Sequence, residues 1–306
     1  MTHIALISRT SKLEYLGPLL QQALPQARYS VWPDPACLDA EVALCWNTPP
    51  GVYAQMPRLQ LVHSIAAGVD NILPGAAELP VCRVVDADLT RGMLQYVLWA
   101  VLHFHRSFDL ALRQQRRRQW SRPPLRPAAE CRVGIMGLGA LGRSVATKLL
   151  AEGYAVAGWS RSLHQIEGVQ THAGQEGFAS FLASTDILVN LLPLTDDTRG
   201  ILGRELFEQL PAGACIVGCG RGEHLVIDEL IAALESGHLR GAVLDVFPHE
   251  PLDAASPLWD MPEVVVTPHM ATMASPQAVV QQVAENIRRL QGGQPLLNRV
   301  DPARGY

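Results

Sequence analysis

Short apolar runs alternate with longer stretches of helical spacing along the first hundred residues of the chain. The apolar runs have the length and composition of buried strands, and Pro, Gly and Asp residues separate them. They cover residues 4–8, 42–46, 59–66 and 81–86, with a helix-like stretch at 12–24 between the first two. Strands that alternate with helices predict a parallel sheet covered by helices.

A long helical pattern over residues 91–114 follows, and Pro123, Pro124 and Pro127 come directly after it. A second alternating system then begins, with a strand at 131–136, a helix at 140–153 and a strand at 154–159. Its later strands are expected at 187–192, 214–219, 241–246 and 263–268, and a helix at 275–293. The pattern predicts two doubly wound α/β units in series.

Composition agrees with a globular chain long enough for two domains, because 48% of the 306 residues are apolar and 18% are charged. The net charge of −4 gives no general reason to expect nucleic acid or a membrane surface as a partner. We expect no signal peptide and no membrane span, since the apolar runs are short. The six cysteines form no C-x-x-C pair, which favours buried, reduced thiols and a cytoplasmic location.

An arginine-rich stretch, residues 113–126, contains six arginines. Nucleic-acid binding is one interpretation of such a stretch. The alternative, an exposed helix end followed by a connector broken by prolines, is favoured because the stretch is short and the chain as a whole is acidic. His103 and His105 lie two apart on a predicted helix and face different directions, so we expect no metal site there.

The sequence GLGALG at 137–142 has the spacing of a glycine turn that binds a dinucleotide pyrophosphate. A predicted strand precedes it, and a helix and a second strand follow, as in a dinucleotide-binding βαβ unit. Gly137 would allow the tight turn, Gly139 the approach of phosphate, and Gly142 the close packing of helix on strand. Ala140 and Leu141 would place the helix N-terminus, with its free N–H groups, at the pyrophosphate.

The second strand of this unit ends without the acidic residue that usually binds the ribose 2′-OH. Ser160, Arg161 and Ser162 stand in its place. Two hydroxyl donors and a planar guanidinium suit a 2′-phosphate, so the sequence predicts a preference for NADPH, with NAD as the other candidate. The alternative is that Arg161 points to solvent and that the preference is slight.

Three polar residues follow predicted strands of the second unit: Arg221, Glu250 and His269. Ligands of open α/β sheets bind beyond the carboxyl ends of the strands, where these side chains could converge. The three residue types suit hydride transfer to a 2-oxo acid. His269 would deliver a proton, Glu250 would orient the imidazole and favour its charged form, and Arg221 would hold the substrate carboxylate and polarise the carbonyl.

The chain resembles the D-isomer-specific 2-hydroxyacid dehydrogenase family over nearly its full length. The glycine turn carries the resemblance together with LLPLT at 191–195, GRGEHLVIDELIAAL at 220–234, GAVLDVFPHEPL at 241–252 and VVVTPHMA at 264–271. Within the family, WSRS at 159–162, LPLTDDTRGIL, SPLWDMPEVVVTPH and the ending LNRVDPARGY are similar to the branch of glyoxylate/hydroxypyruvate reductases.

The resemblance implies roles for particular residues. Arg221, Glu250 and His269 would form the catalytic triad, and Asp245 would contact the nicotinamide carboxamide. The cofactor would also border Leu192 and Pro193, whereas the substrate carboxylate would meet the backbone N–H groups of Ala67 and Gly68. Trp46 lies where the branch has an aromatic wall of the pocket, and ordinary core packing is an equally good interpretation of it.

The resemblance also implies a split layout of two α/β domains with a cleft between them. A flavodoxin-like substrate-binding domain would comprise residues 1–98 plus 279–306, and a Rossmann cofactor domain residues 99–278. Family members are usually homodimers joined through their cofactor domains. One departure is Gly218, where relatives commonly have Asn, and it leaves open whether the loop of Arg221 is rigid. Cys219, beside it, is either a reactive thiol or a small buried residue.

The expected activity is therefore the NADPH-dependent reduction of small 2-oxo acids, glyoxylate to glycolate and hydroxypyruvate to glycerate. Two alternatives remain open. One is an enzyme for a larger 2-oxo acid such as phenylpyruvate, and the other is a regulatory protein that senses a dinucleotide without turnover.

Overall fold

Two parallel β-sheets organise the chain in the computed structural model, which describes residues 1–76 and 78–301. Within these residues, one sheet has five strands in the order β2-β1-β3-β4-β5, and the other has seven in the order β12-β11-β10-β9-β6-β7-β8. The fold class predicted from the sequence, two parallel α/β units, is confirmed. The first sheet consists of β1 (His3–Ser8), β2 (Arg28–Val31), β3 (Val42–Trp46), β4 (Leu61–Ser64) and β5 (Val81–Cys82). The second consists of β6 (Arg132–Met136), β7 (Ala155–Ser160), β8 (Gln170–Ala173), β9 (Ile187–Asn190), β10 (Ala214–Gly218), β11 (Leu239–Leu244) and β12 (Val264–Val266).

The chain divides into a split unit, Met1–Leu89 with the chain from Met273 onward, and a central unit, Thr90–Thr272. The division therefore falls in the first turn of helix α2 (Ala87–His105) and just before α8 (Pro276–Gln291), rather than at 98/99 and 278/279 inside these helices. The reason is that each helix packs along its length on one sheet. Buried residues of α2 belong to the core of the central unit, and those of α8 to the core of the split unit.

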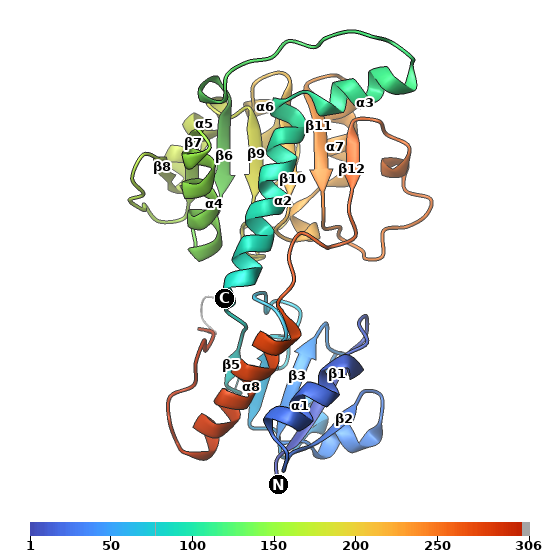
Figure 1. Ribbon diagram of the computed structural model, residues 1–306, viewed down its shortest axis with the longest axis vertical. Helices are drawn as coiled ribbons and strands as arrows, with labels where there is room; N and C mark the ends of the chain where they lie inside the picture. The colour runs from blue at the N-terminus through green and yellow to red at the C-terminus, as the bar shows by residue number, and fades with distance from the viewer. Residues whose placement is uncertain (77, 302–306) are drawn as a thin grey trace. The chain divides into compact units, whose positions relative to one another are not determined.

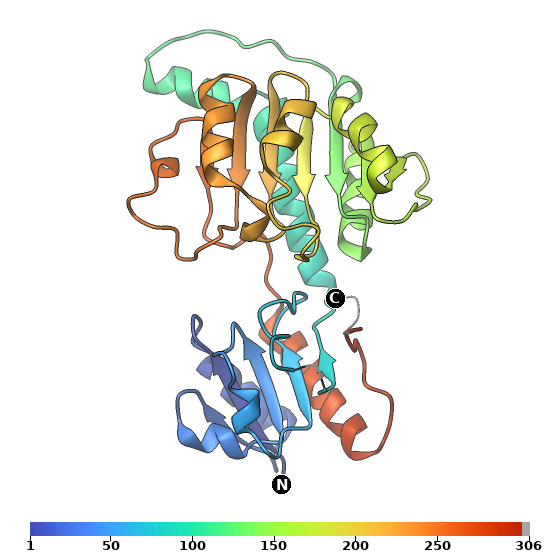
Figure 2. The ribbon, with the colours of Figure 1, turned by 180° about the vertical axis from the view of Figure 1, so that it is seen from behind.

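The split unit has helices α1 (Gly17–Ala23) and α8 on one face of its sheet, as Figure 1 shows. The strands alternate between the two faces, so Ile4 and Leu6 pack under these helices, whereas Ala5 and Ile7 face the other side. Short 3₁₀ helices, Pro35–Asp39 and Tyr53–Gln55, contribute to the core on that other side, which faces the viewer in Figure 2.

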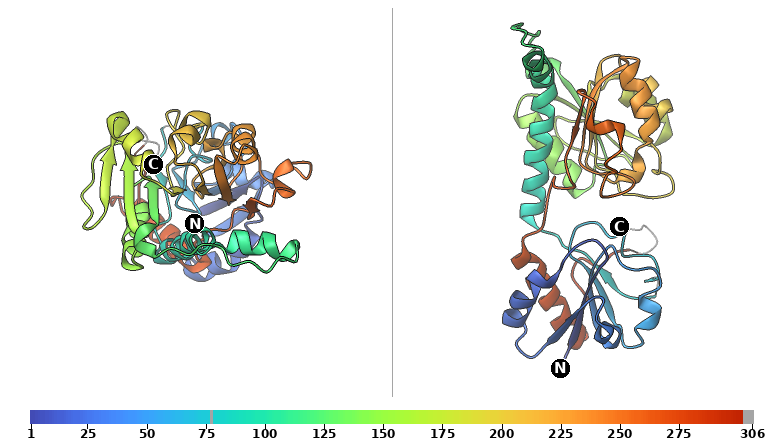
Figure 3. Two further views of the ribbon diagram at one scale, coloured as in Figure 1. Left: turned by 90° about the horizontal axis from the view of Figure 1, so that it is seen from above. Right: turned by 90° about the vertical axis from the view of Figure 1, so that its right-hand side faces the viewer.

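The central unit has α2 and α4 (Ala140–Ala151) on one face of its sheet, and α5, α6 and α7 on the other, as the right-hand view of Figure 3 shows for α2 and α7. The bounds of the latter three helices are Gly174–Ala183, Arg204–Gln209 and Ile227–Glu235. Both faces of the sheet are thereby covered, which is why its central strands are apolar almost throughout. Because both faces of the sheet are covered by helices, the polar side chains of a site lie in the loops at the carboxyl ends of the strands.

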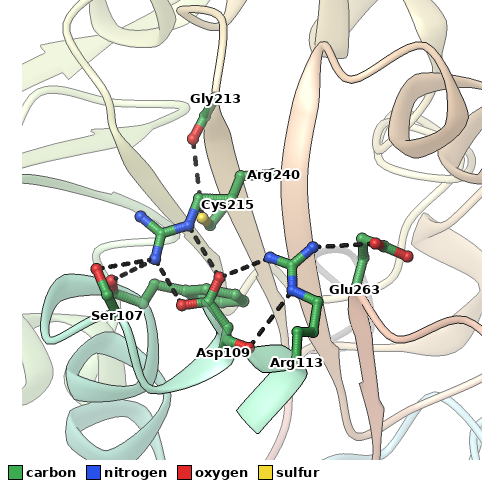
Figure 4. A network of polar contacts seen from close by, with 8 residues as sticks. Ser107, Asp109, Arg113, Gly213, Cys215, Arg240 and Glu263 are labelled. Atoms are coloured by element: carbon green, nitrogen blue, oxygen red, sulfur yellow. Dashed lines mark hydrogen bonds and ion pairs between the residues drawn. The ribbon is translucent and has the colours of Figure 1, made fainter. Parts of the chain in front are cut away.

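The helix predicted over 91–114 is two helices, and that prediction was wrong in this respect. Helix α2 ends at His105, and α3 (Phe108–Arg116) begins after Ser107, which has a left-handed backbone with φ of 55°. Figure 4 shows why the chain turns there. The buried Asp109 carboxylate, in the first turn of α3, binds Arg240 of β11 (2.5 Å) and Arg113 (3.0 Å). Tying α3 to the sheet in this way prevents a straight continuation of α2.

The arginine-rich stretch 113–126 consists of the end of α3 and the connector that leads to β6. Arg113 also pairs with Glu263 (2.9 Å), and Arg126 pairs with Asp186 (3.0 Å). The stretch thus serves in part to attach the connector to the sheet. Among the helices of the described residues, none is long and apolar enough to cross a membrane.

Candidate active site

The glycine turn joins β6 to α4 and depends on glycine at two positions. Gly137 has φ of 98°, and a Cβ there would lie 2.9 Å from the carbonyl oxygen of Leu191. A Cβ on Gly142 would lie 1.8 Å from the carbonyl oxygen of Gly137, so this helical residue packs directly against the turn. Around Gly139, a Cβ would meet nothing within 4 Å.

This open space lies at the N-terminus of α4, where Ala140 is exposed and Leu141 is half-buried. The first N–H groups of a helix have no partners within the helix, and its dipole favours negative charge there. The residues present therefore fit a pyrophosphate group.

The turn at the end of β7 lies beside the glycine turn, because the Gly137 N–H donates to the carbonyl of Trp159 (2.8 Å). Ser160 is buried, and its hydroxyl donates to the carbonyl oxygen of Ser162 (2.8 Å). The Ser160 side chain thus shapes the turn, whereas Arg161 and Ser162 are exposed.

A basic residue that the sequence reasoning missed lies close to this turn. Arg143, in the first turn of α4, donates from Nη2 to His164 Nδ1 (3.3 Å), which connects α4 to the loop after Ser162. Its position directly after the last glycine of the motif was the available signal. Arg143 thus brings a second positive charge close to the loop that follows Ser162.

The loop after β10 carries Arg221, and the chain after β11 carries Glu250. The two segments approach so closely that a Cβ on Gly222 would lie 1.9 Å from the carbonyl carbon of Phe247. Arg221 donates from Nη1 to the carbonyl oxygen of Gly220 (2.9 Å). Only glycine at 222 allows this approach.

His269 and Glu250 are joined by a hydrogen bond of 2.8 Å between imidazole Nδ1 and carboxylate Oε2. The other carboxylate oxygen, Oε1, accepts from the Phe247 N–H (3.0 Å). Both side chains are about one-third exposed, so the pair is accessible from solvent. His269 itself has a left-handed backbone with φ of 51°, a strained conformation for a non-glycine residue that is often found at functional sites.

The pair shifts the pKa values of both partners in opposite directions. The hydrogen bond from Glu250 raises the pKa of His269 above its ordinary value, although burial and the charge of Arg221 oppose this. Burial would raise the pKa of Glu250, but hydrogen bonds from His269 and Phe247 and the nearby positive charges lower it overall. The arrangement thus favours an imidazolium beside a carboxylate.

The turn that carries His269 is held by Asp245, at the end of β11. The Asp245 carboxylate is buried and accepts from the Met270 N–H (2.9 Å), the Ala271 N–H (2.8 Å) and the Thr267 hydroxyl (2.6 Å). Since Thr267 donates there, the Tyr96 hydroxyl must donate to Thr267 (2.6 Å). The role of Asp245 toward the nicotinamide carboxamide remains a prediction, and in the structure its carboxylate holds this turn.

Leu192 and Pro193 lie in the loop after β9. The Leu192 N–H donates to Asn190 Oδ1 (3.2 Å), and Leu192 is buried whereas Pro193 is exposed. In the split unit, Trp46 ends β3 and is half-buried, and the loop after β4 carries Ala67 and Gly68. Ser64 shapes that loop, since its hydroxyl donates to the carbonyl oxygen of Gly68 (2.8 Å).

Cys219 is buried, and burial raises the pKa of its thiol well above the usual value. A thiol rather than a thiolate is therefore the stable form, which favours the structural interpretation of this residue. Gly218 ends β10, and its carbonyl accepts from the Asp245 N–H (2.9 Å).

The Glu250→Gln variant is expected to lower the pKa of His269, because an uncharged amide stabilises the imidazolium less than a carboxylate does. NMR titration of the histidine ring protons in wild type and variant measures the shift. The exposed Glu235→Gln variant, at the end of α7, is the control and should leave His269 unchanged. An unaltered His269 pKa in Glu250→Gln would contradict the hydrogen-bonded pair.

Comparison with known proteins identifies the family of this chain. The model of the "D-isomer specific 2-hydroxyacid dehydrogenase, NAD binding domain" matches residues 98–271. A glyoxylate/hydroxypyruvate reductase A from Serratia proteamaculans is 43% identical over 297 residues, 94% of each chain. The chain therefore belongs to the D-isomer specific 2-hydroxyacid dehydrogenase family.

Solved structures agree with this assignment. A family member from Klebsiella pneumoniae 342 is 46% identical, with a TM-score of 0.94 over 99% of this chain and 98% of that chain. An NADPH-dependent glyoxylate/hydroxypyruvate reductase from Sinorhizobium meliloti, solved with NADP and sulfate, is 36% identical, with a TM-score of 0.91 over 100% of both chains. The similarity thus extends over both units and is not confined to the matched domain.

Proposed function

We propose that this protein reduces small 2-oxo acids with NADPH, glyoxylate to glycolate and hydroxypyruvate to glycerate. The observation that carries the proposal is the 2.8 Å bond between His269 and Glu250, in the same unit as the Arg221 loop and the glycine turn. The names of the relatives from Serratia and Sinorhizobium support the choice of substrates.

In this reaction NADPH, when bound, supplies a hydride to the carbonyl carbon. Arg221 binds the substrate carboxylate and polarises the carbonyl with its guanidinium. Because Nδ1–H of the imidazolium donates to Glu250, the proton on Nε2 of His269 is the one delivered to the substrate oxygen. Hydride and proton together convert the carbonyl into the hydroxyl of the 2-hydroxy acid.

The substrate side of the proposal includes the N–H groups of Ala67 and Gly68 as donors to the carboxylate, and Trp46 as a wall that limits substrate size. Initial rates with glyoxylate, hydroxypyruvate and phenylpyruvate test this assignment. Faster turnover of the two small acids supports it. A preference for phenylpyruvate would assign a larger substrate, and lack of turnover with all three would favour a dinucleotide sensor.

The Arg161→Ala variant is expected to raise the KM for NADPH about 10- to 100-fold and to leave that for NADH nearly unchanged. The reason is that a charge-assisted hydrogen bond to the 2′-phosphate contributes about 1.5–3 kcal/mol, and NADH lacks this phosphate. Steady-state rates with both cofactors measure the effect, with the exposed Arg117→Ala as control. Equal changes for NADPH and NADH would exclude a phosphate contact of Arg161.

We also propose that the protein is a homodimer in the cytoplasm, joined through its central units. Phe108 and Leu112 of α3, each about half exposed, support this, because they offer apolar surface beside the connector. Light scattering of the purified protein determines the oligomeric state.

A further inference from the structure

His224 lies fully buried between the two loops that the proposed function assigns to substrate and cofactor. Its Nδ1 accepts a hydrogen bond from the Arg221 N–H (3.2 Å) and lies 2.8 Å from Asn190 Nδ2. Its Nε2 lies 3.3 Å from the carbonyl oxygen of Pro193. One imidazole therefore contacts the Arg221 loop, the end of β9 and the loop after β9.

The partners define the protonation state of the ring. The Arg221 N–H can only donate, so Nδ1 carries no proton and accepts. Asn190 donates from its NH₂ group to the same nitrogen. The orientation of the Asn190 amide is known because its Oδ1 accepts from the Leu192 N–H (3.2 Å). Nε2 then carries the proton and donates to Pro193, because a carbonyl oxygen can only accept. The ring must be neutral, in a single tautomer, for all these bonds to form.

The absence of a side chain at Gly220 leaves the space that the His224 ring occupies. A Cβ on Gly220 would lie 3.0 Å from His224 Nδ1, 3.1 Å from the carbonyl oxygen of Leu192 and 3.2 Å from Asn190 Nδ2. The glycine-rich sequence before Arg221 therefore lets three segments meet at the imidazole. The loop that carries Arg221 is thus held by contacts with His224.

We propose that His224 is a positioning residue that couples the two loops. Its Nδ1 fixes the position of the Arg221 backbone N–H, and its Nε2–H fixes the position of the Pro193 carbonyl in the cofactor loop. The inference rests on the proposed function, which assigns Arg221 to the substrate and the loop at Leu192 and Pro193 to the cofactor. Because the two contacts use different ring nitrogens, they can be removed separately.

Two substitutions each preserve one side of the ring. In His224→Asn, the amide oxygen can replace Nδ1 as acceptor, and the donor to Pro193 is lost. In His224→Gln, the amide NH₂ can replace Nε2–H as donor, and the acceptor for Arg221 and Asn190 is lost. A buried polar group left without a partner costs about 1–3 kcal/mol, which corresponds to roughly 5- to 150-fold in binding.

The expected result is a split between the two ligands. His224→Asn should raise the Kd for NADPH, measured by fluorescence titration, by roughly 5-fold or more, and change the KM for glyoxylate less than about 2-fold. His224→Gln should show the reverse, with a raised KM for glyoxylate and a nearly unchanged Kd for NADPH. The control is His238→Gln, which removes a histidine of the same unit that contacts the Phe207 carbonyl through Nε2 (2.7 Å), and it should change neither constant.

The wild-type protein offers a test that needs no variant. ¹⁵N NMR of the histidine rings at neutral pH should show His224 uncharged, with its proton on Nε2. A charged ring or a proton on Nδ1 would overturn the proposal, as would equal effects of the two substitutions on both ligands, or no effect on either. If the wild type reduces no 2-oxo acid, the proposed function fails, and the NADPH titrations and the ring tautomer still decide whether His224 holds the loops.

Discussion

Replacing His269 with Asn is expected to lower kcat for 2-oxo acid reduction by about 10²- to 10⁴-fold, the usual contribution of a positioned acid. Asn can still accept or donate a hydrogen bond toward Glu250, but it cannot deliver a proton. The Kd for NADPH should change little, because the glycine turn and the turn at Ser160 do not involve His269. Single-turnover rates and fluorescence titration measure the two quantities separately.

The pH dependence of kcat/KM in the wild type is the control for this prediction. Reduction requires the imidazolium, so kcat/KM should be high at low pH and fall as the pH rises through the pKa of His269. Since Glu250 raises that pKa, the fall should lie above the ordinary value of 6.5. The residual activity of His269→Asn should lack this fall. A variant that retains wild-type kcat, or the same pH profile, would show that another group supplies the proton.

Replacing Arg221 with Lys is expected to lower kcat/KM for glyoxylate by about 10²- to 10³-fold, which is the range for loss of one donor to a developing oxyanion. Lysine keeps the charge, but it lacks the planar fork that binds a carboxylate through two parallel hydrogen bonds. The Arg221 loop is also packed against Phe247 at Gly222, so a side chain of different shape cannot be accommodated by moving the loop.

Chemical rescue distinguishes this role from a loss of folding. Guanidinium added at millimolar concentration should restore part of the activity of Arg221→Ala, and it should not affect Arg117→Ala, which changes an exposed arginine of the connector. Failure of rescue in a folded variant, together with an unchanged KM for glyoxylate, would contradict a direct contact between Arg221 and the substrate.

The strands with continuous apolar sequence could be predicted from the sequence, because burial on both faces leaves a signal in composition. Strands β2 (Arg28–Val31) and β8 (Gln170–Ala173) were missed. Both lie at the edge of a sheet, where one side is open to solvent and polar residues replace the apolar run. The break at Ser107 was missed for another reason, since Arg240, the partner of Asp109, lies 131 residues away.

The candidate site likewise has residues that could be predicted from the sequence and contacts that could not. Arg221, Glu250 and His269 could be singled out because each follows a strand, and parallel strands bring their carboxyl ends to one edge. Their catalytic roles remain predictions. The contacts of His224 with Asn190, and of Thr267 with Asp245, could not be predicted, because they join residues 34 and 22 positions apart with no periodic pattern.

The most direct test of the central claim is the transfer of the hydride itself. NADPH carrying deuterium at nicotinamide C4, prepared in each of its two stereochemical forms, is incubated with the wild-type protein and glyoxylate, and the glycolate is analysed by mass spectrometry and NMR. We expect deuterium at C2 of glycolate from one form only. Glycolate without deuterium from either form, or no glycolate at all, would contradict the assignment of this chain as a reductase of glyoxylate.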